Sequence, residues 1–89
     1  MLNSRETLIA DCQVFEPRRR GIYVENSRNT TIAGCQILER NRAGVMGAAI
    51  EAIGDCPGLF IRDNLYHPGA RGGIITPEGA TLNNNILAE

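Results

Sequence analysis

The chain has 89 residues and a formal net charge of −1, and all nine of its basic residues are arginine. This length allows one domain at most, and the small net charge provides no global attraction for nucleic acid or an anionic membrane. No stretch approaches the roughly 18 consecutive apolar residues of a membrane-spanning helix. We therefore expect neither nucleic acid nor a membrane as a partner.

One pattern occurs four times: an aliphatic residue, two variable residues, Cys or Asn, one variable residue and then an apolar residue. Its copies lie at 9–14, 32–37, 61–66 and 82–87, so their starts are 23, 29 and 21 residues apart. A period of this length is typical of a solenoid, because each unit can bury its apolar face only by stacking on its neighbours. We predict a single segment over 1–89 with repeats of roughly 1–20, 21–48, 49–72 and 73–89.

Two kinds of strand are predicted within a repeat, in chain order. The apolar alternation at 21–24 indicates a strand, and turn-forming residues follow it at 26–29. Residues 30–32 form the second strand. The five-residue spacing from Ile32 to Ile37 is odd, so the alternation must break between them. We expect a corner at residues 34–35, followed by a short third strand.

A leucine-rich repeat is the alternative, because its tail L-x-x-N/C-x-L also fits all four copies when other apolar residues are allowed. Its front half requires aliphatic residues two and five positions before the first aliphatic residue of the tail. Only Leu59 meets this requirement. The segment between repeats is also β-like and not helical, which favours a β-solenoid.

The motifs G-I-x-V, N-S-x-N and T-x-I-x-x-C/N-x-I are clearest over 21–38. They resemble right-handed parallel β-helix proteins, namely the pectate-lyase-like group and the shorter repeats of periplasmic copper-site maturation proteins. The resemblance implies an all-β fold, a right-handed parallel β-helix of about four open-ended coils with three parallel sheets around an apolar bore. It also implies an extracellular, surface or periplasmic location. The residues expected to point into the bore are Ile9, Val14, Ile22, Val24, Ile32, Ile37, Ile50, Ile61, Tyr66, Ile74, Leu82 and Leu87.

The Cys or Asn of each copy is expected at a corner, stacked from coil to coil. An Asn amide can satisfy neighbouring buried polar groups, and a Cys fills the same small volume. Adjacent rungs about 4.8 Å apart fall within the Cα range of a disulfide, but parallel side chains give it poor geometry. With one histidine and no C-x-x-C spacing, no metal or cofactor is expected. The predicted structural ladder is Cys12, Cys35, Asn64 and Asn85.

Arginines concentrate in the loops that follow the last apolar residue of each repeat. A solenoid brings such loops to one edge, where forked guanidinium groups could bind the carboxylates of an anionic polysaccharide. The alternative is an ordinary solvated edge whose arginines pair with Glu16 and Glu39. Arg5 and Arg28 are expected to stack at another corner. The candidate binding strip is Arg18, Arg19, Arg20, Arg40, Arg42 and Arg71.

No catalytic residue is assigned. His67 is expected to be a plain loop residue, and Glu51 and Arg62 are a possible outward-facing pair. We predict a non-catalytic β-helix segment of an exported or surface protein that contacts anionic polysaccharide through the arginine edge. The alternatives are part of a polysaccharide lyase, C5-epimerase or glycoside hydrolase, and a phage tailspike or adhesin stalk.

Neither end of the chain resembles a cap. We therefore expect a piece of a longer β-helix domain, with the remaining coils of a longer chain as partners. The same open ends predict self-association end to end.

Overall fold

The computed structural model describes residues 5–15, 19–39, 46–69 and 72–88. These ranges contain eleven short strands and no helix. The strands are β1 (Leu8–Ala10), β2 (Gln13–Phe15), β3 (Arg20–Glu25), β4 (Thr31–Ala33), β5 (Gln36–Leu38), β6 (Ala48–Ile53), β7 (Phe60–Arg62), β8 (Leu65–Tyr66), β9 (Ile74–Ile75), β10 (Thr81–Asn83) and β11 (Ile86–Leu87).

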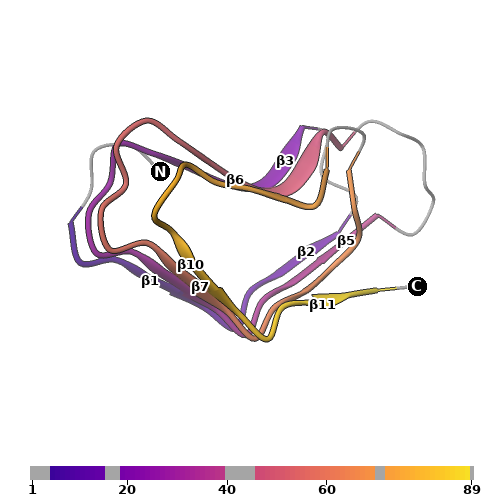
Figure 1. The fold of residues 1–89 in the computed structure, drawn as a ribbon. Coiled ribbons are helices and arrows are strands. Elements are labelled where there is room, and N and C mark those ends of the chain that lie inside the picture. Colours follow the sequence, from indigo (N-terminus) through magenta and orange to yellow (C-terminus); the bar gives the residue numbers. More distant parts are fainter. Residues whose placement is uncertain (1–4, 16–18, 40–45, 70–71, 89) are drawn as a thin grey trace.

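The strands form three sheets in which every pairing is parallel. The sheets have the orders β1-β4-β7-β10, β2-β5-β8-β11 and β3-β6-β9. Four coils follow from these orders: coil 1 contains β1 and β2, coil 2 β3 to β5, coil 3 β6 to β8, and coil 4 β9 to β11. Figure 1 looks along the stack, where successive coils lie over one another. The arrangement is a parallel β-helix, and the leucine-rich alternative is wrong for the described residues.

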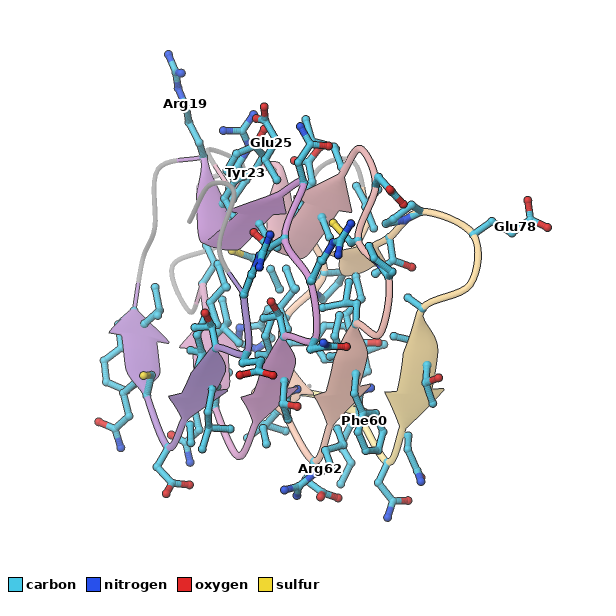
Figure 2. The ribbon with its side chains drawn as sticks, turned by 90° about the vertical axis from the view of Figure 1, so that its left-hand side faces the viewer. Arg19, Tyr23, Glu25, Phe60, Arg62 and Glu78 are labelled. Carbon is cyan, nitrogen blue, oxygen red and sulfur yellow. The ribbon has the colours of Figure 1, made fainter. Side chains whose placement is uncertain are left out.

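Like positions of the repeats lie side by side in the sheets. Ile9 is paired with Ile32, Ile32 with Ile61, and Ile61 with Leu82. The spacing of the repeats in the sequence therefore gives the register of this sheet, despite the different repeat lengths. In Figure 2 the strands of this sheet stand in a row, one coil after another.

The bore is apolar in the two middle coils. Most of the residues predicted to point inward there are fully buried: Val24, Ile32, Ile37, Ile50 and Ile61. In coil 4 the residues predicted to point inward keep the register of the bore, because Leu82 is paired with Ile61 and Leu87 with Tyr66, but they are not covered: Leu82 is 50% exposed and Leu87 is 55% exposed. Among the described strands, those of coil 4 have a neighbouring coil on one side only.

The predicted corner after the second strand is confirmed. Gly34 has a φ of 66°, and Asp11, Asp63 and Asn84 have φ between 54° and 57° at the matching positions of the other coils. Gly, Asp and Asn are the residues that adopt this left-handed conformation at least cost. The expected backbone stacking of Arg5 on Arg28 is also present, as a parallel bridge.

No helical segment of the described chain has the length and hydrophobicity needed to cross a membrane.

Candidate functional site

The four corner residues lie one above another, and the two asparagines connect three coils. Asn64 Oδ1 accepts a hydrogen bond from the Cys35 backbone N–H at 2.9 Å. Asn64 Nδ2 donates to the Ile32 carbonyl at 3.1 Å and to Asn85 Oδ1 at 2.9 Å, and Asn85 Nδ2 donates to the Ile61 carbonyl at 3.0 Å. Each amide therefore reaches back to the preceding coil. This geometry fits a structural role, because it satisfies buried polar groups of the corner.

The cysteines at the corner differ in environment. All three cysteines of the chain are free; Cys35 and Cys56 are buried, whereas Cys12 is exposed. Burial raises the pKa of the Cys35 thiol, so this thiol stays protonated at neutral pH. The expectation of a small buried thiol is wrong for Cys12, because in the described part of the chain coil 1 has a neighbouring coil on one side only. The described residues include no group of three His, Cys, Asp or Glu side chains placed to hold a metal ion.

The structure describes only part of the predicted arginine strip. Arg18, Arg40, Arg42 and Arg71 lie outside the described residues. Arg19 is exposed, and its side chain extends away from the body of the protein in Figure 2. The sequence placed Arg20 in a loop, whereas the structure makes it the first residue of β3.

Four side chains form a connected group on the sheet β3-β6-β9. Arg20 Nε lies 3.1 Å from Glu51 Oε1, and the Arg20 guanidinium carbon lies 4.3 Å from the centre of the Tyr23 ring. Tyr23 Oη donates a hydrogen bond to Glu25 Oε1 at 2.6 Å. Tyr23 is also the strand partner of Glu51. We call Arg20, Tyr23, Glu25 and Glu51 the outer-face cluster.

The contacts within the outer-face cluster determine its chemistry. The hydrogen bond to Glu25 is the main cause that raises the pKa of Tyr23 above its ordinary value of 10.0. Tyr23 is therefore a protonated donor at neutral pH and not a base. Glu51 is only 6% exposed, and the Arg20 guanidinium compensates its negative charge. The cluster combines an aromatic ring, a cation and two carboxylates in positions fixed by mutual contacts.

The pair suggested by the sequence, Glu51 with Arg62, is wrong. Glu51 lies in β6, whereas Arg62 lies in β7 of a different sheet. Arg62 Nη1 instead lies 2.9 Å from Asp63 Oδ2, and its guanidinium faces the Phe60 ring at 6.0 Å. The true pairing had a signal in the sequence: alignment of 21–24 with 49–52 places Tyr23 beside Glu51.

His67 and Glu39 are buried rather than solvated. The Glu39 backbone N–H donates to His67 Nδ1 at 2.9 Å, and Glu39 Oε2 accepts from the Met46 backbone N–H at 2.9 Å. Both residues are 3% exposed. The expected plain loop histidine is thus a packed residue. The sequence suggested Glu39 as a partner for the arginines of the edge. In the described structure its carboxylate has at least one partner that is not an arginine, namely the Met46 backbone N–H.

Comparison with known proteins gives one match. A family model described as a right-handed beta helix region matches residues 1–87. No curated protein and no solved structure shows a significant match.

Proposed function

Since the chain belongs to the right-handed β-helix family, which confirms the predicted fold class, we propose that it is a non-catalytic repeat segment that binds an anionic polysaccharide. We place the contact on the outer-face cluster and the neighbouring arginine edge. The proposal includes an exported or surface-located parent protein, because a long extracellular polymer is accessible there.

The observation that carries the proposal is the fixed position of Arg20 and Tyr23 beside exposed Arg19. Arg20 lies against the Tyr23 ring and Glu51, and the Tyr23 hydroxyl is held by Glu25. Side chains that are ordered before binding lose little conformational entropy when a ligand arrives. Aromatic rings offer apolar surface to sugar rings, and guanidinium groups pair with carboxylates. A uronate chain presents both kinds of group.

The cluster supports binding better than catalysis. A lyase or epimerase needs a base that can remove a proton. Tyr23 is a poor base at neutral pH, because its hydroxyl group donates a hydrogen bond to Glu25, which raises the Tyr23 pKa and keeps the hydroxyl protonated. The Glu51 carboxylate is already paired with Arg20. These contacts are those expected of a binding platform.

A catalytic segment is the second candidate, favoured by one feature. Glu25 and Glu51 are two carboxylates on one small surface, and glycoside hydrolases act through carboxylate pairs. Incubation with polygalacturonate separates the two candidates: new reducing or unsaturated chain ends, or inverted configuration at C5, would support catalysis, and the absence of all three with measurable binding supports the non-catalytic segment.

Replacing Arg19 by alanine is expected to weaken binding of a polygalacturonate fragment about tenfold, the effect of losing one charge-assisted hydrogen bond of about 1.5 kcal/mol. Isothermal titration calorimetry at constant ionic strength measures this change. Arg28→Ala is the matched control, because Arg28 is also exposed but lies at another corner. The double variant Arg40→Ala/Arg42→Ala tests the part of the strip outside the described residues.

The expected order is a loss in Arg19→Ala and in the double variant, with Arg28→Ala close to the original chain. Equal losses in Arg19→Ala and Arg28→Ala would indicate only general charge attraction. Absence of binding by the unmodified chain would refute the proposed ligand class.

A further inference from the structure

The two ends of the coil stack present strand edges that could pair with each other. Among the described strands, β1 and β2 at one end, and β10 and β11 at the other, each have a partner strand on one side only. Their remaining backbone groups can therefore pair with another chain. Large apolar side chains accompany these edges: Leu8 and Phe15 are exposed in coil 1, and Leu82, Ile86 and Leu87 in coil 4.

The coil 4 end also contains a groove of about 460 Å³. Tyr66, Ile74 and Leu82 contribute apolar surface to it, and residues 83–85 contribute polar groups. The groove lies where the bore meets solvent. Its lining combines inward-facing residues of coils 3 and 4 with the asparagines of the last corner.

Register makes the two ends match. Ile9, Ile32, Ile61 and Leu82 form one row along the stack, and Val14, Ile37, Tyr66 and Leu87 form another. If coil 1 of another copy continued the same register, its Ile9 would lie on Leu82 and its Val14 on Leu87. Both contacts are apolar, and the strands would remain parallel.

We propose that a second copy of this chain docks head to tail, with its coil 1 on coil 4 of the first copy. The contact continues the coil-to-coil stacking already present within the chain and removes apolar side chains at both ends from water. Such a contact joins two different surfaces, so it can repeat and form an open linear assembly. The net charge of −1 opposes such growth only weakly.

The corner ladder provides a test specific to this orientation. Within the chain, the backbone N–H groups of Cys35 and Asn64 each donate to the side-chain oxygen of the asparagine in the following coil. At the junction, the corresponding residue after Asn85 would be Cys12 of the second copy, which has no amide oxygen. Cys12→Asn would supply that oxygen and is expected to tighten association about tenfold, as for one or two added buried hydrogen bonds.

Cys35→Asn is the matched control. Its new amide would lie inside the stack, where it can reach the Cys12 backbone and the Ile9 carbonyl that the Cys35 thiol now approaches at 3.8 Å. It should change the melting temperature and leave the association constant unchanged. A gain in association from Cys35→Asn equal to that from Cys12→Asn would overturn the head-to-tail orientation.

The decisive experiment uses two variants of the full chain that each block one end. Leu82→Lys places a charge on the inward-facing row at the coil 4 end, and Val14→Lys places one on the inward-facing row at the coil 1 end. Leu82 is 50% exposed and Val14 is partly exposed in a single copy, so both variants should retain the fold, which circular dichroism melts verify. Sedimentation velocity over a concentration series then measures assembly.

We expect the unmodified chain to form a series of linear oligomers and each variant alone to be monomeric. The mixture of the two variants should form a dimer and nothing larger, because one intact end of each kind remains. A monomeric unmodified chain at all concentrations would overturn the proposal. Dimers of either variant alone would overturn it too, since they would require contact between like ends.

Discussion

Replacing Asn64 by alanine is expected to lower the free energy of unfolding by about 3 kcal/mol or more, from the cost of unpaired buried polar groups. Asn64 is 1% exposed. Its removal deprives the Cys35 backbone N–H of its acceptor and takes one donor from the Ile32 carbonyl and one from Asn85 Oδ1. Urea unfolding followed by circular dichroism measures the loss.

Asn85→Ala is the matched control for this prediction. Asn85 makes comparable contacts but lies in coil 4 and is partly exposed, so water can replace some of the lost partners. We expect a clearly smaller loss of stability than in Asn64→Ala. Equal losses would show that the amide ladder does not stabilise the stack through its buried hydrogen bonds.

Gly21→Ala is expected to destabilise the fold by about 1–3 kcal/mol, the usual cost of forcing an extra methyl group into a packed core. An added Cβ at Gly21 would overlap the Ile37 side chain and lie 2.6 Å from the Ala49 carbonyl oxygen. The Ala49 backbone cannot move freely, because its N–H donates to the Gly73 carbonyl at 2.9 Å. Thermal unfolding compares the two chains.

A double-mutant cycle with Ile37→Ala isolates the steric cause. Ile37→Ala alone should destabilise the protein because it opens a cavity in the bore. In the double variant the new methyl group can enter that cavity, so the combined loss should be smaller than the two single losses added together. Additive losses would show that Gly21 is required for another reason.

The repeat spacing was sufficient to predict the fold, because the register that pairs like positions keeps the aliphatic residues of every coil on the bore side. The odd spacing from Ile32 to Ile37 predicted the corner, and Gly34 adopts the left-handed conformation there. The bore residues of the middle coils follow from the same alternation. Exposure of Leu82 and Leu87 could not follow from it, since the pattern specifies which way a side chain points and not whether another coil covers it.

The candidate site was less predictable. The sequence pointed to the arginine edge, and the structure shows Arg20 bound to Glu51 and Tyr23 on a strand. Alignment of the repeats could have placed Tyr23 beside Glu51. It could not have shown that the Arg20 side chain crosses to the neighbouring coil, because that depends on rotamers and on the path of the preceding loop.

Binding at the outer-face cluster can be tested most directly by nuclear magnetic resonance. Backbone amide shifts of the 15N-labelled chain would be recorded while a short oligogalacturonate is added, with a neutral oligosaccharide of equal length as control. We predict changes concentrated at Arg19, at residues 20–25 of β3 and at residues 48–53 of β6, with little effect of the neutral sugar. Changes confined to the sheet β1-β4-β7-β10, or none at all at saturating concentrations, would contradict the proposed binding face.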